Sequence, residues 1–123
     1  MYYEINDYNA LREALHSMCE QLQKQLVGEQ SLFHCKLVAS ELLSNVLQHG
    51  GGRAYLTAEI ANGVVTIRVR ADNEYRPPEE SRCSDVDCEY GRGLYIIDTI
   101  CESREYSEGQ GICVTVRITK EET

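Results

Sequence analysis

The segment from Lys36 to Gly52 reads KLVASELLSNVLQHGGG and places Glu41, Asn45 and His49 at intervals of four residues. At 100° per residue of an α-helix, these three side chains span only about 80° of the helix surface. Apolar residues fill the neighbouring arc, so the polar stripe is predicted to lie along the margin of the buried face. An acid, an amide and an imidazole placed there can hold a hydrated divalent cation and leave a carboxylate free to polarise a hydroxyl group. A helix with a mixed surface and no ligand explains the same spacing.

Composition limits the classes of protein to which this chain can belong. A length of 123 residues fits one domain, predicted to span residues 1–123. No apolar run approaches the ~18 residues of a membrane span, and the first residues lack a basic region followed by an apolar one. The expectation is therefore a cytoplasmic protein that does not cross a membrane. The formal charge of -8 argues against a nucleic-acid surface and favours a basic partner protein.

The six cysteines are predicted to be free thiols. Four of them lie in segments with apolar periodicity, where a thiol packs as a small hydrophobic group. The other two, Cys83 and Cys88, have no second pair of Cys or His nearby, which disfavours a zinc site. His16 and His34 lie outside the polar stripe and are interpreted as ordinary histidines rather than ligands.

Two helices are predicted in the first half of the chain, after a short edge strand at residues 2–5. Asp7 or Asn9 can cap the first helix, and Gly28 ends its apolar stripe. That stripe is predicted to be core and has helical spacing: Leu11, Leu15, Met18, Leu22 and Leu26. Ser31 can cap the second helix, which carries the polar stripe and stops at the glycine triplet of residues 50–52.

A hairpin is predicted next, with strands at residues 54–61 and 64–71 around Asn62-Gly63, a dipeptide that favours a tight turn. In the second strand, apolar residues alternate with Thr66, Arg68 and Arg70, so one face packs and the other meets solvent or a partner. The strand ends at Asp72. A loop of about fifteen residues without periodicity follows, which is typical of a lid, a binding loop or disorder.

The loop is predicted to close at Gly91-Arg92-Gly93-Leu94, immediately before a third helix. Glycines at that point let backbone amides approach an anion at the positive end of the helix, although glycine pairs also form ordinary turns. Strands at residues 103–107 and 112–118 complete the chain around a glycine turn. The predicted fold class is α+β, a two-layer α/β sandwich with helices on one face of a mixed, largely antiparallel sheet. Its far face is expected to be available to a partner.

These features, taken in order, resemble the histidine-kinase-like ATPase (GHKL) superfamily over nearly the whole chain, and within it the small anti-sigma-factor serine kinases. ELLSNVLQHG at residues 41–50 is similar to the N box of the family, and GRGLYIID at residues 91–98 is similar to its second glycine box. The resemblance implies a GHKL ATPase fold that binds ATP and Mg²⁺. The implied partners are a sigma factor and an anti-sigma-factor antagonist protein, and homodimerisation is left open.

The resemblance also implies a role for each matching residue. Asn45 would coordinate Mg²⁺ at the phosphates, Glu41 would act as the catalytic base or water-positioning residue, and His49 would support the same end of the pocket. Asp72 would accept a hydrogen bond from the adenine amino group. Four residues would wrap the phosphates as part of the lid: Gly91, Arg92, Gly93 and Leu94.

One departure from the family pattern leads to two alternative hypotheses about function. The family follows its aspartate with D-x-G-x-G, whereas this chain has Asp72-Asn73-Glu74-Tyr75-Arg76, so Glu74 and Arg76 replace both glycines. Side chains there strain a turn that needs positive φ or fill space that ATP requires, and a glutamate repels phosphate. The first hypothesis is an anti-sigma factor with Mg-ATP-dependent protein serine kinase activity on its antagonist. The alternative is a nucleotide-poor binding module that sequesters a partner without kinase activity.

Overall fold

The computed structural model describes residues 1–50, 53–72, 89–107 and 109–118. These residues contain five strands, three α-helices and one π-helical turn, η1, at the end of α2. In chain order these are β1 (Tyr2–Ile5), α1 (Tyr8–Lys24), α2 (Glu29–Asn45), η1 (Val46–Gly50), β2 (Ala54–Ala61), β3 (Val64–Ala71), α3 (Glu89–Ile100), β4 (Ser103–Ser107) and β5 (Gly111–Arg117). None of the helices in the described part is long and apolar enough to cross a membrane.

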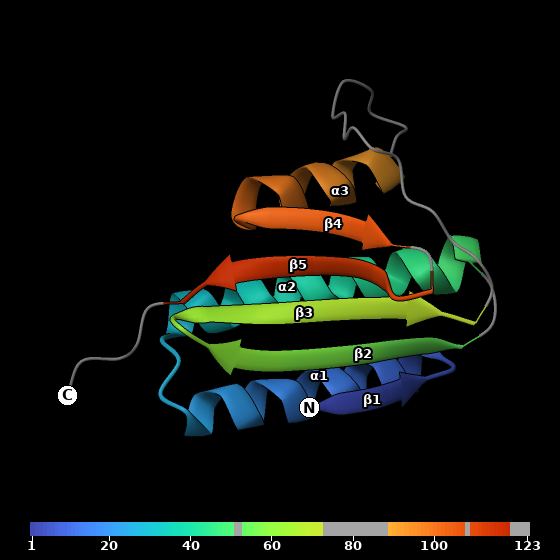
Figure 1. Ribbon diagram of the computed structural model, residues 1–123. Helices are drawn as coiled ribbons and strands as arrows, with labels where there is room; N and C mark the ends of the chain where they lie inside the picture. Colours follow the sequence, from blue (N-terminus) through green and yellow to red (C-terminus); the bar gives the residue numbers. More distant parts are fainter. Residues whose placement is uncertain (51–52, 73–88, 108, 119–123) are drawn as a thin grey trace.

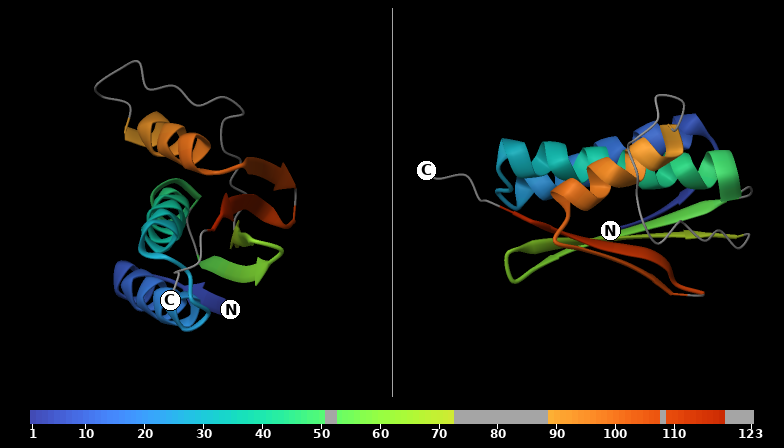
Figure 2. Two further views of the ribbon diagram at one scale, coloured as in Figure 1. Left: turned by 90° about the vertical axis from the view of Figure 1, so that its left-hand side faces the viewer. Right: turned by 90° about the horizontal axis from the view of Figure 1, so that it is seen from above.

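The strands form one sheet in the order β1-β2-β3-β5-β4, and each of the four described pairings is antiparallel. All three helices cover one face of this sheet, with α2 between α1 and α3, and no described helix covers the other face (Figures 1 and 2). The predicted two-layer α+β sandwich is therefore confirmed. Within the described ranges, its two layers enclose a single apolar core.

Alternation along the strands decides which side chains enter that core. In β3, Val65, Ile67 and Val69 are buried against the helices, whereas Arg68 and Arg70 are exposed on the opposite face. In β2 and β5, too, every second residue is buried, because successive side chains of a strand point to opposite faces. The predicted division of β3 into a packed face and a polar face is confirmed.

Helix α1 begins as predicted but ends earlier than its apolar spacing indicates. The Asp7 side chain accepts a hydrogen bond from the Ala10 amide at 2.7 Å, which caps the first turn. At the other end, the amide of Val27 bonds to the carbonyl of Leu22 and the amide of Leu26 to that of Gln23, a Schellman motif. Leu26 takes φ of 63° there and is 53% exposed, so its prediction as a core residue is wrong.

Helix α2 begins two residues before the predicted cap. Its N-cap is Gly28, and Ser31 lies inside the first turn of the helix, where it is buried. The helix packs against both neighbouring helices and against β2, β3 and β5. This central position explains the weak sidedness of its sequence, because apolar residues are needed on several sides at once.

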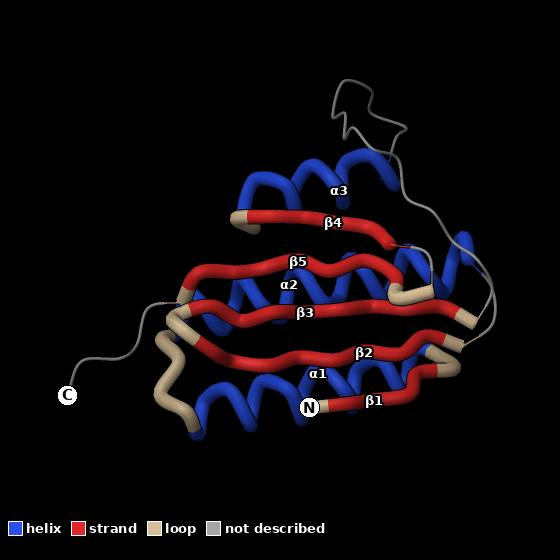
Figure 3. Tube along the Cα trace, in the orientation of Figure 1, coloured by secondary structure: helices blue, strands red, loops and turns tan. Residues whose placement is uncertain are grey.

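The turn between β2 and β3 has the geometry that its sequence predicts (Figure 3). Asn62 and Gly63 have φ of 54° and 78°, as a two-residue turn with positive φ at both positions requires. At the far end of the sheet, Gly111 starts β5 with φ of 83°, and a Cβ there would lie 2.2 Å from the carbonyl oxygen of Val69. Only glycine allows β5 to approach β3 so closely at this point.

The third helix also begins earlier than predicted. Because α3 starts at Glu89, the segment Gly91-Arg92-Gly93-Leu94 lies within its first two turns rather than before it. The predicted loop from Asn73, with the replaced glycine positions Glu74 and Arg76 and the zinc question at Cys83 and Cys88, lies outside the described residues.

The four described cysteines are free thiols, as predicted: Cys19, Cys35, Cys101 and Cys113. Burial raises the pKa of Cys35 and of Cys101 to about 12. Both thiols are therefore protonated at neutral pH, which makes them poor nucleophiles and poor metal ligands.

Candidate functional site

Asn45, the last residue of α2, has the most informative surroundings of the predicted site residues. Asn45 is only 4% exposed, and its Nδ2 atom has no hydrogen-bond partner among the described residues. A buried donor without an acceptor costs about 1–3 kcal/mol, so folded proteins rarely retain one without a reason. A ligand that brings an acceptor to this position would remove that penalty.

Glu41 lies one turn before Asn45, on the same α-helix, and is half-buried. The structure thus brings these two residues together along the helix, as their four-residue spacing predicts. The spacing from Asn45 to His49 does not continue in the same way, because residues 46–50 are wound as a π-helix. The assumption of 100° per residue fails over this last step, and the His49 side chain lies outside the described residues. Single π-helical turns are frequent at functional sites.

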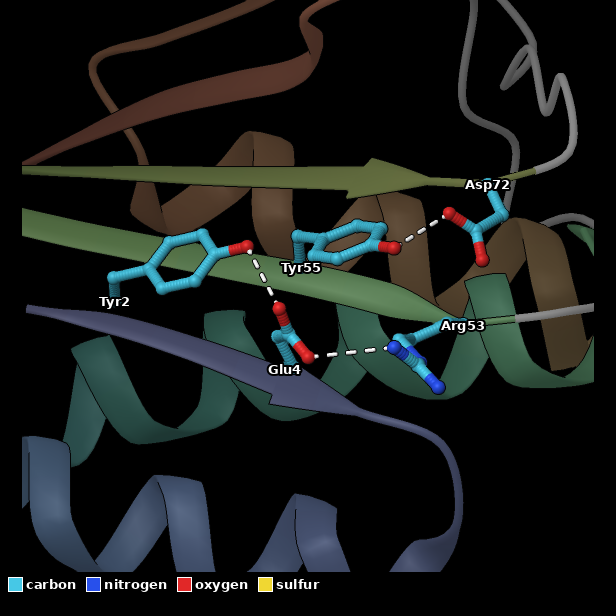
Figure 4. A network of polar contacts seen from close by, with 5 residues as sticks. All are labelled: Tyr2, Glu4, Arg53, Tyr55 and Asp72. Carbon is cyan, nitrogen blue, oxygen red and sulfur yellow. Dashed lines mark hydrogen bonds and ion pairs between the residues drawn. The ribbon is translucent and has the colours of Figure 1, made fainter.

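Asp72, immediately after β3, points to the opposite side of the sheet from α2. Its Oδ1 accepts a hydrogen bond of 2.6 Å from the hydroxyl of Tyr55, which lies between the buried residues Ala54 and Leu56 and therefore on the helix-free face (Figure 4). This hydrogen bond raises the pKa of the Tyr55 hydroxyl above its ordinary value of 10.0, because it stabilises the protonated phenol. The structure does not bring the Asp72 carboxylate together with Asn45.

A small polar network surrounds this pair on the same face. Arg53 contacts Glu4 at 3.4 Å, and the hydroxyl of Tyr2 lies 3.5 Å from the other carboxylate oxygen of Glu4 (Figure 4). The backbone amide of Asp72 donates to the carbonyl of Arg53 at 2.9 Å. The backbone of Asp72 is therefore held by Arg53, the residue before β2, while its carboxylate is engaged by Tyr55.

The start of α3 supplies the remaining predicted residues. The first amides of an α-helix have no partner inside the helix and form an anion-binding end. Gly91 is the third residue of α3 and belongs to this group, whereas Gly93 lies far enough inside for its amide to bond to the helix itself. The side chains of Arg92 and Leu94 are outside the described residues.

The donor set at Asn45 is compatible with Mg²⁺. Within the described ranges, no three His, Cys, Asp or Glu side chains gather as a metal site. Mg²⁺ does not need such a cage, since it retains several waters and is commonly held by one or two side-chain oxygens together with phosphate oxygens. The carbonyl oxygen of Asn45 is a hard ligand of the kind that Mg²⁺ prefers.

The sequence did not single out Tyr2 and Tyr55 as members of a site. Their rings stack on the helix-free face with centroids 6.4 Å apart, and the guanidinium of Arg70 lies 4.3 Å from the centre of the Tyr55 ring. The alternation of β2 and β3 places Tyr55 and Arg70 on the same face. The pairing of β1 with β2, which brings Tyr2 to this place, has no local sequence signal.

The fold and the site together define an α+β sandwich protein whose central helix carries an acid and a buried amide. A family model described as the histidine kinase-like ATPase domain matches residues 6–119, and the chain belongs to this family. The resemblance to the GHKL superfamily is thereby confirmed, and ATP is the nucleotide that such a domain indicates. A comparison with curated proteins found no significant match.

Proposed function

We propose that the chain is an anti-sigma factor that binds Mg-ATP along the Glu41–Asn45 side of α2. It would phosphorylate a serine of an antagonist protein and otherwise hold a sigma factor in the cytoplasm. The observation that supports this most is the buried, unpartnered Nδ2 of Asn45 at the N-box position of a histidine kinase-like ATPase domain. A structural asparagine would have acquired a partner within the fold.

Each residue has a distinct task in this proposal. Asn45 would offer its carbonyl oxygen to the metal and its amide hydrogens to a phosphate oxygen. Mg²⁺, when bound, neutralises the charge that develops on the phosphates. Glu41, half-buried one turn away, would accept the proton of the incoming serine hydroxyl. His49 would support the same end of the pocket.

The opposite wall of the proposed pocket is the start of α3. The amide of Gly91 would bind phosphate oxygens, and Arg92 would add positive charge, with Gly93 and Leu94 completing the lid. Asp72 would recognise the adenine amino group. For that role its carboxylate must leave the Tyr55 hydroxyl, to which it is bonded in this structure.

Nucleotide binding is tested by isothermal titration calorimetry of the whole chain with ATP and Mg²⁺. We expect saturable binding in the wild type and its loss in Asn45→Ala. Asn9→Ala is a matched control, because it removes the same group from an exposed position on α1. No heat at millimolar nucleotide would overturn the proposed ATP site, and full affinity in Asn45→Ala would place the site elsewhere.

The kinase step is tested with γ-labelled ATP and a purified antagonist protein. We expect Glu41→Gln to bind ATP normally and to transfer no label, since the amide cannot accept the serine proton. Unchanged labelling by this variant would remove Glu41 from the catalytic role.

A binding module without nucleotide is the second candidate, and one observation favours it. The carboxylate expected to recognise adenine is bonded to Tyr55 on the helix-free face of the sheet, whereas Asn45 lies on α2. In this alternative, Asn45→Ala would leave partner binding unchanged and ATP would not affect it. Release of the partner on addition of Mg-ATP would exclude the alternative.

A further inference from the structure

Two arginines on the helix-free face have no acidic partner among the residues that the structure describes. The described part of the chain pairs Arg53, Arg104 and Arg117 with Glu4, Asp98 and Glu102 respectively. By contrast, Arg68 and Arg70 form no ion pair with any described residue, although the chain carries 20 acidic residues against 12 basic ones. Arg68 has only a 3.8 Å contact to the sulfur of Cys113. Both guanidinium groups can therefore form an ion pair with a group outside this part of the chain.

The orientation of Arg70 suits the binding of a carboxylate. Its guanidinium lies 4.3 Å from the centre of the Tyr55 ring, a cation–π contact that holds the flat group in place. Stacking leaves the N–H donors at the edge of the guanidinium unused, and these match the two oxygens of a carboxylate. An arginine fixed in this way loses less entropy on binding than a free one.

Tyr2 extends this arrangement. It is 57% exposed and stacks on Tyr55 with an angle of 21° between the rings. Tyrosine and arginine are among the residues most enriched at the energetic centres of protein interfaces. We call Tyr2, Tyr55, Arg68 and Arg70 the arginine–tyrosine surface.

The arginine–tyrosine surface is hollowed rather than flat. Its four residues line a depression of about 250 Å³, together with Thr57 and the β4–β5 turn at Gly109 and Gln110. That volume accommodates one or two side chains of a docked segment, and Gln110 adds a neutral polar group. Of the described acids on this face, Glu4 is engaged by Arg53 and Asp72 by Tyr55, and Glu59 and Glu105 do not line the depression.

We propose that the arginine–tyrosine surface docks an acidic segment of a partner protein, with Asp or Glu carboxylates on Arg68 and Arg70. The net charge of -8 repels such a partner at long range. At physiological ionic strength, however, the Debye length is about 8 Å, so the nearest charges decide the contact. The surface lies on the other side of the sheet from Asn45, so it is separate from the metal and phosphate end of the proposed nucleotide pocket.

The test is an NMR titration of the ¹⁵N-labelled chain with a decapeptide of alternating Glu and Thr, at physiological salt. We expect shifts at the amides of Thr57, Arg68 and Arg70, and a Kd at least tenfold weaker in the double variant Arg68→Gln/Arg70→Gln. Arg117→Gln is the matched control, because this exposed arginine lies at the other end of the same sheet face and is already paired with Glu102. It should leave the Kd unchanged.

Several results would overturn the proposal. Equal affinity for a Gln-Thr decapeptide would show that carboxylates are not recognised, and shifts confined to the helices would place the contact elsewhere. Tighter binding of single-stranded RNA at the same amides would assign the surface to nucleic acid. A wild-type dimer that the double variant converts to monomer in sedimentation would assign it to self-association.

Discussion

Replacing Asn45 by leucine should stabilise the ligand-free protein while destroying its proposed function. Leucine has nearly the shape of asparagine but no polar atoms, so it removes the unpartnered Nδ2 from its buried position. Residues kept for binding are often destabilising in this way, because their interactions are completed only by the ligand. A residue kept for structure would behave in the opposite way.

The magnitude follows from the burial of the side chain. Asn45 is 4% exposed, so the full penalty of an unsatisfied donor, about 1–3 kcal/mol, applies to the unliganded state. Leucine is also the better helix former by a few tenths of a kcal/mol. Accommodating the two methyl groups of leucine in the packed core offsets part of this gain. We expect a net increase of about 1–2 kcal/mol in the free energy of unfolding.

Urea unfolding followed by circular dichroism, without nucleotide, measures this change. Ser31 provides the matched control, since it is equally buried at 4% but does have an interaction partner. Ser31→Ala should therefore lower stability by about 0.5–1.5 kcal/mol. Destabilisation of Asn45→Leu by a similar amount would refute the reasoning, because it would show that the Asn45 amide already has a partner in the fold.

Three further predictions concern the framework. Gly111→Ala should lower the free energy of unfolding in urea by several kcal/mol, because the added Cβ would lie 2.2 Å from a backbone atom and the residue has positive φ. Gly109→Ala should lower it by only about 1–2 kcal/mol, since Gly109 has φ of 86° but open space around it. Similar losses for the two variants would contradict the close approach of β5 to β3. Leu26→Gly should raise stability by about 0.5–1 kcal/mol, since Leu26 is half exposed at φ of 63°, and a loss would show that its side chain packs. The hydrogen bond to Asp72 stabilises the fold below pH 10.0, and this contribution to stability is lost as pH rises through the raised pKa of Tyr55. Asp72→Ala should move one tyrosine transition to lower pH in an absorbance titration. An unchanged titration would exclude the hydrogen bond.

Strong local signals made most of the fold predictable from the sequence. The strands β2 and β3 have the predicted bounds, because alternation and the Asn62-Gly63 turn act together over short distances. Helix ends were less predictable, since their geometry depends on the chain beyond them. Leu26 continues the apolar spacing of α1, yet the Schellman motif exposes its side chain to solvent. Ser31 has the residue type of an N-cap, but Gly28 is the N-cap of α2.

The candidate site was predictable only where one regular helix carries it. Glu41 and Asn45 lie on a single α-helix, so their spacing alone brings them together. His49 follows a π-helical turn that no periodicity indicates, and α3 begins at Glu89 rather than after the glycines. The direction of the Asp72 carboxylate depends on Tyr55 in a neighbouring strand, which a linear pattern does not specify.

The pairing of β1 with β2 has a consequence for the order of folding. Tyr2 lies opposite Thr57, a separation of 55 residues in the chain, whereas β2 and β3 are joined by a turn of two residues. By the logarithmic cost of loop closure, bringing β1 to the sheet requires about 3 kcal/mol more than closing the hairpin, for a strand of only four residues. Strand β1 should therefore join the sheet late in folding, and its amides should gain protection from hydrogen exchange after those of the β2–β3 hairpin. Because Tyr2 belongs to β1, a nascent or partly folded chain would lack the complete arginine–tyrosine surface, and acidic partners would select molecules that have finished folding.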